Sequence, residues 1–501
     1  MRRLVLLMGL FGCDEPARRA GPQDADIDRG GVDARRPDAG RDGVVVDGAR
    51  PDARPDAARD VGVLEAGRPD AGPRDVGRPD AGPRDAQVVD AVVDAQIDAG
   101  PPAPCVGLVL PPPPDSPDGS EVCNYRDDDG DGLVDEGFPY EFIGEPVRIT
   151  AEPEQSPDEL QIAWSGDGYG VAWYSSPGFR FVKLGPSGCP VTPLHQVDQN
   201  PAMPFLPDSL DLAYSGDRFA VVFTQERRRE PGSPGGFGTF VQLFDRAGQP
   251  VGALIDLDPT LSHLRFNAIV PFNDQFAVFS TAYHPQRGGL SYSAFAILDR
   301  DGRIVQGPSH PYDALPGRGQ GMGTFIGLAY DGEGFGMAWH GVGNWFMRWS
   351  PAGEVLTPPA EPDEIGYYGR TSGIAWTGQH YVIPNDGLDN RHLGLGFVTP
   401  DLQQRFAVEV GDNDVGTQTL DIFSANGQLF HYGAFSGVFF SRLDPLGQPI
   451  APRLRTEPER WVEGFSAVTG GPLATVSARD LDPEVNGELA IFFSRIGCQG
   501  E

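Results

Sequence analysis

Lysine is almost missing from this chain of 501 residues: Lys183 is the single lysine among 39 lysine and arginine residues, against 71 aspartate and glutamate residues. The formal net charge is -32 at pH 7. Binding to nucleic acid needs a basic surface that neutralises phosphates, so this charge argues against a nucleic-acid partner. We attribute the preference for arginine to genome composition.

The sequence also lacks the motifs of common enzymes. It has no His-Glu-x-x-His, no Gly-x-Ser-x-Gly and no glycine-rich phosphate loop, and its eight histidines are scattered singly. We therefore assign no catalytic residue and favour a protein that is not an enzyme, with an enzyme kept as the alternative.

Long apolar runs are missing except at the start. Arg2 and Arg3 precede an apolar run over residues 4–11, the pattern of a short secretory signal. The string that ends at Cys13, Leu-Phe-Gly-Cys, resembles the lipobox of bacterial lipoproteins; a chance cysteine is the alternative. The resemblance implies that residues 1–13 are a lipoprotein signal with Cys13 acylated. No other apolar run could span a bilayer, so the lipid would be the only membrane attachment, in the inner or the outer membrane.

Aromatic residues are missing from residues 14–104, where Arg-Pro-Asp-Ala-Gly units recur. A segment with few apolar residues and frequent proline and glycine cannot bury a core. We expect a disordered, extended tether over residues 14–104.

An aspartate-rich stretch follows, within a small module over residues 105–140. Its carboxylates alternate at the spacing of a calcium loop. This spacing suits Ca²⁺, which prefers several converging oxygen ligands. The expected ligands are Asp127, Asp129, Asp131, the Leu133 carbonyl, Asp135 and Glu136. A solvated acidic linker is the alternative. Phe138 stands where an EF-hand has its bidentate glutamate, so no flanking helix pair is expected.

The stretch is similar to thrombospondin type 3 calcium loops and to a metal-binding motif of secreted bacterial proteins, which runs Cys-Asn, an Asp run, Asp-Gly and Asp-Glu-Gly. That resemblance implies bound Ca²⁺ and an exported protein. Gly130 stands where the bacterial motif often has a second cysteine, so its local disulfide pattern does not carry over.

Four cysteines remain if Cys13 is lipidated, an even number that suits two disulfides in an exported protein. Three pairings are open. We favour Cys105 with Cys123 and Cys189 with Cys498; Cys123 with Cys498 is a competing pairing.

The rest of the chain repeats a hairpin pattern. Clear copies cover residues 162–173, 212–223, 328–339 and 374–381, each with β-branched and aromatic residues around a turn rich in glycine and aspartate. An aromatic or large apolar residue after each turn marks the repeats: Tyr169, Phe219, Phe276, Phe335, Tyr381, Leu429 and Leu473. The spacing of roughly 45 to 60 residues and two further strands per unit predict a seven-bladed β-propeller over residues 141–501.

The last repeat stops after its third strand, at Cys498. A matching fourth strand lies before the first repeat, at residues 143–150. We expect this N-terminal outer strand to complete the seventh blade and close the ring. The repeats resemble propeller-like repeats of secreted bacterial lipoproteins, in which they often follow the same metal-binding motif.

Acidic residues recur in the connections between repeats: Glu152, Glu154, Asp256, Asp258, Glu361, Asp363, Glu364, Asp412, Asp414, Glu457 and Glu459. We expect them to surround one mouth of the channel and to bind a cation or a cationic ligand there; simple solvation of the loops of an acidic protein is the alternative. The hairpin turns, including Asp167, are expected to be structural.

The favoured function is an envelope-anchored, non-enzymatic binding or adhesion lipoprotein, with a glycan or a protein as its extracellular ligand. An extracellular polysaccharide-acting enzyme (a glycosidase or lyase) and a purely structural envelope component are the alternatives.

The calcium prediction can be tested by thermal melting with and without a chelator. If Ca²⁺ binds the aspartate-rich loop, the chelator lowers the melting temperature and speeds proteolysis between residues 127 and 135, because ligand binding stabilises the folded state. If the chelator changed neither the melting temperature nor the rate of proteolysis, the metal-binding prediction would be wrong.

Overall fold

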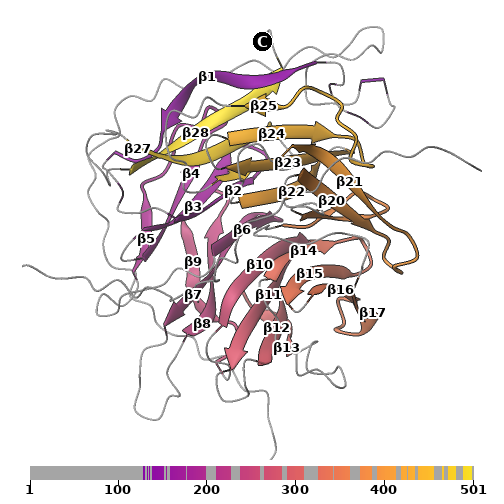
Figure 1. The fold of residues 1–501 in the computed structure, drawn as a ribbon. Helices are drawn as coiled ribbons and strands as arrows, with labels where there is room; N and C mark the ends of the chain where they lie inside the picture. Colours follow the sequence, from indigo (N-terminus) through magenta and orange to yellow (C-terminus); the bar gives the residue numbers. More distant parts are fainter. Residues whose placement is uncertain are drawn as a thin grey trace, which may run out of the picture. The chain divides into compact units, whose positions relative to one another are not determined.

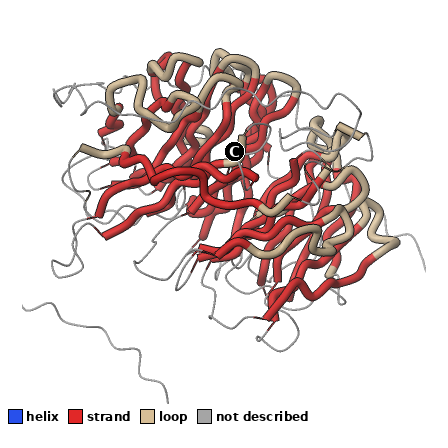
Figure 2. Tube along the Cα trace, turned by 90° about the horizontal axis from the view of Figure 1, so that it is seen from above, coloured by secondary structure: helices blue, strands red, loops and turns tan. Residues whose placement is uncertain are grey.

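The structure, a computed structural model, describes the ordered strands and turns of one compact unit, residues 81–501. The described residues are 128–129, 133, 135, 138–151, 154, 158–175, 178–198, 210–226, 237–259, 264–284, 290–309, 325–341, 343–361, 373–385, 392–412, 419–425, 427–434, 438–455, 465–467, 472–480 and 489–498. None of them is helical (Figure 2), and this part of the chain has no helix that could cross a membrane. The expected signal and tether lie outside the described residues.

Seven antiparallel sheets of four strands make up the propeller (Figure 1). Blade 1 contains β2 (Asp158–Trp164), β3 (Tyr169–Ser175), β4 (Gly178–Leu184) and β5 (His195–Asp198). Blade 2 contains β6 (Leu210–Ser215), β7 (Arg218–Glu226), β8 (Phe237–Asp245) and β9 (Pro250–Asp256). Blade 3 contains β10 (Leu264–Phe272), β11 (Gln275–His284), β12 (Leu290–Leu298) and β13 (Ile304–Ser309).

The remaining blades follow the same order. Blade 4 contains β14 (Phe325–Tyr330), β15 (Phe335–Gly341), β16 (Gly343–Trp349) and β17 (Val355–Ala360). Blade 5 contains β18 (Ala375–Trp376), β19 (Tyr381–Asn385), β20 (His392–Val398) and β21 (Arg405–Asp412). Blade 6 contains β22 (Thr419–Ala425), β23 (Gln428–Ala434), β24 (Val438–Leu443) and β25 (Leu454–Arg455). Blade 7 contains β26 (Phe465–Ala467), β27 (Ala474–Asp480), β28 (Leu489–Cys498) and β1 (Tyr140–Arg148).

The seventh blade takes its outer strand from the N-terminal side, as predicted. β1 runs antiparallel to β28, with Tyr140 opposite Cys498 and Arg148 opposite Phe492. Figure 1 shows this purple strand alongside the yellow β28. The strand begins at Tyr140 and ends at Arg148, slightly earlier than the predicted segment. The seven-bladed propeller closed by an N-terminal strand is therefore confirmed.

The hairpin tips explain the recurring glycines. Gly166, Gly216, Gly332 and Gly378 occupy the same tip position and have φ values of 88°, 61°, 98° and 93°. This left-handed backbone carries no steric penalty for glycine, which lacks a Cβ atom. The tips therefore allow the short turns that the sequence predicted.

The apolar core is divided among the interfaces between blades. Seven clusters of buried side chains each join two consecutive blades, and one of them packs Ala474, Val476 and Phe493 of blade 7 against Tyr169 and Trp173 of blade 1. Since each buried large side chain contributes roughly 1.5–3 kcal/mol, every interface around the ring contributes to stability.

The end of the aspartate-rich module packs onto blade 6. Arg442 is 2 % exposed, donates hydrogen bonds to the backbone carbonyls of Asp135 and Phe138, and stacks over the Tyr140 ring at 3.8 Å. The Tyr140 hydroxyl donates to the Asp135 carboxylate at 2.6 Å. The chain is thus fixed to the propeller before β1 begins.

Close contact between blades 4 and 5 provides a stability test. A Cβ atom on Gly327 would lie 2.8 Å from the Gly373 carbonyl carbon, which is backbone and cannot move aside. We expect Gly327→Ala to lower the free energy of unfolding by about 1–3 kcal/mol, measured by urea denaturation. Gly185→Ala, where the nearest atom is a Val191 methyl at 3.3 Å, is the control and should change stability far less. Equal effects would contradict this account.

Candidate ligand-binding site between blades 4 and 5

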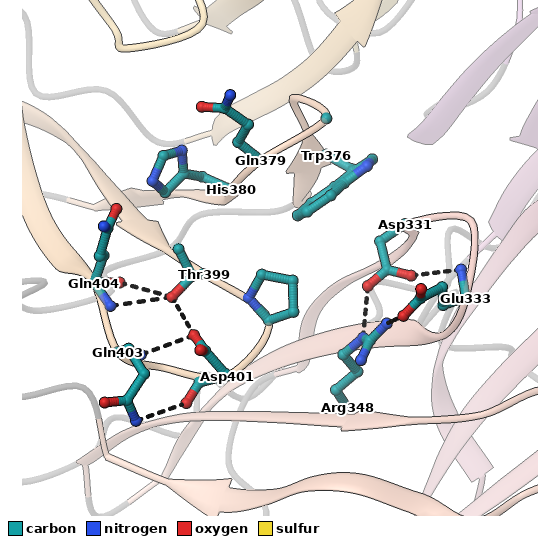
Figure 3. A pocket seen from close by; sticks show the side chains of 12 residues that line it. Asp331, Glu333, Arg348, Trp376, Gln379, His380, Thr399, Asp401, Gln403 and Gln404 are labelled. Carbon is teal, nitrogen blue, oxygen red and sulfur yellow. Dashed lines mark hydrogen bonds and ion pairs between the residues drawn. The ribbon is translucent and has the colours of Figure 1, made fainter.

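A cleft of about 570 Å³ lies between blades 4 and 5. Its walls are the hairpin tips 331–334 and 377–380 and the turn 399–404, which joins the third and fourth strands of blade 5 (Figure 3). Small-molecule sites usually occupy about 300–1,000 Å³, so the cleft is large enough for one. It opens on the face that carries the short hairpin turns.

The blade 4 wall is built around Arg348 of β16. Its Nε atom lies 2.5 Å from the Asp331 carboxylate, and one terminal nitrogen lies 3.2 Å from the Glu333 carboxylate. The Asp331 side chain is 2 % exposed, whereas the Glu333 side chain is 85 % exposed. The hairpin tip fixes Asp331, whose other oxygen accepts the N–H groups of Glu333 and Gly334.

The opposite wall is the turn that contains Asp401. The Asp401 carboxylate accepts hydrogen bonds from the Thr399 hydroxyl at 2.7 Å and the Gln403 N–H at 3.0 Å. The Thr399 hydroxyl in turn accepts the Gln404 N–H. Asp401, Gln403 and Gln404 are exposed and belong to the cleft lining.

Trp376 and His380 lie between the walls. The half-buried Trp376 ring packs against Tyr381, with ring centroids 4.8 Å apart. His380 is 5 % exposed and meets Phe397 and Phe406 in edge-to-face contacts. Neither imidazole nitrogen has a hydrogen-bond partner among the described residues. A buried polar group without a partner costs about 1–3 kcal/mol, so a polar ligand or a water molecule that reached it would be stabilised.

The interface of blades 1 and 2 differs from the cleft at the equivalent turn. At that interface Arg246, in the turn after β8, spans the gap and pairs with Asp167 of the neighbouring hairpin tip at 2.8 Å. Pro400 occupies the position of Arg246 in blade 5. The turn of blade 5 is also one residue longer, closing through Thr399 and Gln404 rather than through Asp245 and Gln249. Blade 5 therefore sends no cation across the cleft.

Two carboxylates of the cleft are held in their charged form. Burial alone would raise the pKa of Asp331, but Arg348 and the backbone N–H groups of Gly334 and Glu333 bring it below its usual value. The Thr399 hydroxyl and the Gln403 N–H lower the pKa of Asp401. Both groups are thus hydrogen-bond acceptors at neutral pH.

A second pair of carboxylates occupies equivalent positions on the first strands of blades 2 and 6. Asp211 accepts the N–H groups of Leu212 and of Ile269 in the next blade. Asp421 accepts the Tyr432 hydroxyl and the Ile422 N–H. Burial raises the pKa of each carboxyl to about 7, and the charge of Asp211 adds to the increase at Asp421. These bonds satisfy strand-edge N–H groups, so we assign both residues a structural role.

The predicted metal ligands are only partly described. Asp127, Asp131 and Glu136 lie outside the described residues. Of the others, Asp135 is buried and bound by Tyr140, Asp129 is exposed and Leu133 is half-buried. No group of three or more histidine, cysteine, aspartate or glutamate side chains is placed to hold a metal within the described part of the chain. The calcium site stays a prediction, as does the lipidation of Cys13, which is not described.

The expected ring of acidic connections is wrong for two of its members. Glu154 is 2 % exposed and pairs with Arg180 at 2.5 Å, and Asp258 is 1 % exposed. These side chains stabilise the fold and do not face open solvent. Glu361 is exposed and Asp256 is half-buried. The side chains of Glu152, Asp363, Glu364, Asp412, Asp414, Glu457 and Glu459 are not described.

The cleft lies at other turns than the acidic connections that the sequence singled out. We expected the hairpin tips to be structural, yet two of them line the cleft. Trp376, His380, Arg348 and Asp401 were not singled out. Aligning the repeats could have shown that the turn of blade 5 is one residue longer. Which side chains face each other, however, depends on the packing of adjacent blades.

Comparison with known proteins shows only distant structural similarity. No family model matches the chain, and no curated protein matches it. Solved structures that match include a subtype N10 neuraminidase-like protein of A/little yellow-shouldered bat/Guatemala/060/2010 (8 % identity, 72 % of this chain and 100 % of that chain, TM-score 0.37). Polysaccharide lyase Uly1 matches at 10 % identity over 72 % of this chain and 100 % of its own, with a TM-score of 0.48. The RRP9 WD40 repeats match at 10 % identity over 72 % and 97 %, with a TM-score of 0.41.

The buried carboxyls make stability depend on pH. Their folded-state pKa of about 7 lies above the ordinary value of 3.8, so between these values the folded protein binds more protons than the unfolded chain. Stability therefore falls as pH rises through this range. Between pH 5 and pH 8 the free energy of unfolding should fall by about 1–3 kcal/mol more in the wild type than in Asp211→Asn, as measured by urea unfolding.

Asp301→Asn, in an exposed turn, is the control for the loss of one charge. An equal pH dependence in the wild type and in Asp211→Asn would show that this carboxyl does not titrate in the range.

Proposed function

We propose that this protein is an envelope-anchored lipoprotein whose propeller binds a saccharide in the cleft between blades 4 and 5, without converting it. The observation that carries the proposal is Trp376, a half-buried indole in a cleft lined mostly by polar residues. Such a ring offers a large apolar surface at a small entropic cost. The C–H face of a sugar ring can pack on that surface while its hydroxyl groups meet polar atoms.

The polar lining suits a ligand rich in hydroxyl groups. Gln379, Gln403 and Gln404 each offer a donor and an acceptor, and the carboxylates of Asp331 and Asp401 offer acceptors. His380 adds two nitrogens that lack a protein partner among the described residues. A few such groups around an apolar floor are typical of small-molecule sites.

Two pKa values favour binding over hydrolysis. Glycoside hydrolysis needs a carboxyl group that stays protonated near neutral pH, together with a second carboxylate. The pKa values of Asp331 and Asp401 are shifted downward, which is the wrong direction for a general acid. We therefore prefer a binding protein to a glycosidase.

Anchoring and calcium are part of the same proposal. Acylation of Cys13 would hold the protein at the membrane, and residues 14–104 would place the propeller away from it. Ca²⁺ on Asp127, Asp129, Asp131, Leu133, Asp135 and Glu136 would stiffen the end of the tether. The packing of Asp135 and Phe138 against Arg442 supports this role, because a rigid loop would then connect directly to blade 6.

We also propose disulfides between Cys105 and Cys123 and between Cys189 and Cys498. The second is supported by the contact of blade 1 with blade 7: a Cβ atom on Gly188 would meet the Phe493 ring of β28. A bond between Cys189 and Cys498 would tie the last blade to the first.

Substitution of Trp376 tests the binding site. Trp376→Ala should weaken saccharide binding at least tenfold, about 1.4 kcal/mol, in glycan-array and calorimetric measurements on the purified chain. Trp164→Ala is a matched control, because Trp164 holds the equivalent place in blade 1 and packs on Tyr169 at 4.6 Å. Both changes remove a similar packing contact, and only the first should affect binding. Equal losses, or no saccharide bound by the wild type, would overturn the proposal.

A further inference from the structure

We infer that the saccharide bound in this cleft carries a free amino group, as in a 2-amino-2-deoxy sugar. The inference rests on the proposed saccharide binding and specifies the substrate class of that site. It is drawn from the charge balance of the cleft, from the indole of Trp376 and from the buried imidazole of His380.

The cleft carries more negative than positive charge. Three carboxylates line it, Asp331, Glu333 and Asp401, against one guanidinium, Arg348. Arg348 is already paired with two of the three, at 2.5 and 3.2 Å. An acidic sugar would find no uncompensated cation there, and its carboxylate would be repelled. A cationic ligand would relieve the excess negative charge.

Two carboxylates lie within reach of such a ligand. The Glu333 side chain is 85 % exposed, and only one of its oxygens meets Arg348. Asp401 is also exposed, and one of its oxygens accepts both the Thr399 hydroxyl and the Gln403 N–H. Figure 3 shows Glu333 and Asp401 on opposite walls. An ammonium group between the walls could donate to either carboxylate, and hydrogen bonds to charged groups are stronger than neutral ones.

The aromatic ring points to the same chemistry independently. A cation within about 6 Å of an indole face gains roughly 0.5–2 kcal/mol, and tryptophan is the strongest partner. His380 supplies the further polar contact, because its imidazole is 5 % exposed and its nitrogens have no partner among the described residues. A hydroxyl beside the amine could satisfy one of these nitrogens. The cleft therefore combines a charged, an aromatic and a neutral contact for an amino sugar.

Three trisaccharides that differ only at carbon 2 test the inference: β-1,4-linked glucosamine, N-acetylglucosamine and glucose. Calorimetry with the full chain at low salt should give at least tenfold tighter binding of the glucosamine trimer. The preference should shrink at about 1 M salt, where the Debye length is about 3 Å. Asp401→Asn and Glu333→Gln should each reduce it, and Glu354→Gln, an exposed turn residue of blade 4, should leave it unchanged.

The outcomes separate the two claims. Equal binding of the three trimers, or tighter binding of a neutral one, would overturn the amino-sugar inference and leave saccharide binding intact. A preference that survives both carboxylate substitutions would also overturn it. Absence of binding to all three, with no other saccharide bound on an array, would remove the proposed function and the inference together.

Discussion

The pairing of β1 with β28 is the interaction on which the propeller depends. Without it, β28 would present an open strand edge, and such edges pair with other chains. The pairing also holds blade 7 in place, so that Phe493 can pack against Tyr169 of blade 1. Because every blade buries its apolar faces only against its two neighbours, closing this one seam allows all seven interfaces to form.

One position shows how the repeats were adapted. At one position of the third strand three blades have a buried cation beneath the hairpin tip: Lys183 opposite Gly170, Arg348 opposite Gly336 and Arg442 opposite Phe430. Lys183 bonds Ser165 and Asp167 of its own tip, Arg348 pairs with Asp331, and Arg442 holds the segment before β1. A buried cation at this position thus stabilises a turn in blade 1, forms a cleft wall in blade 4 and anchors the segment before β1 in blade 6, because the groups around it differ.

The cleft arises where the repeat pattern breaks. In blade 5 Phe397 replaces this cation and His380 stands where blades 1 and 4 have Gly168 and Gly334. The imidazole lies beside Phe397, and Pro400 makes no ion pair like the one between Arg246 and Asp167 at the interface of blades 1 and 2. Blade 5 therefore makes no ion pair of the kind that Lys183 and Arg348 make with their own hairpin tips, and the cleft lies next to Trp376. Function in a repeat protein is best sought where a repeat departs from its neighbours.

The propeller could be predicted from the sequence, because hairpin periodicity and turn glycines are local signals. The strand at Tyr140–Arg148, which precedes the first repeat, supplies the fourth strand that the seventh repeat lacks. The sequence could not locate the cleft. Trp376 and Trp164 are alike in sequence context, and only the packing of blade 5 on blade 4 places Trp376 in the cleft. Likewise Glu154 reads as an exposed loop acid, yet Arg180 and Ser175 bury it. Such outcomes depend on contacts between residues far apart in the chain, which only the tertiary structure brings together.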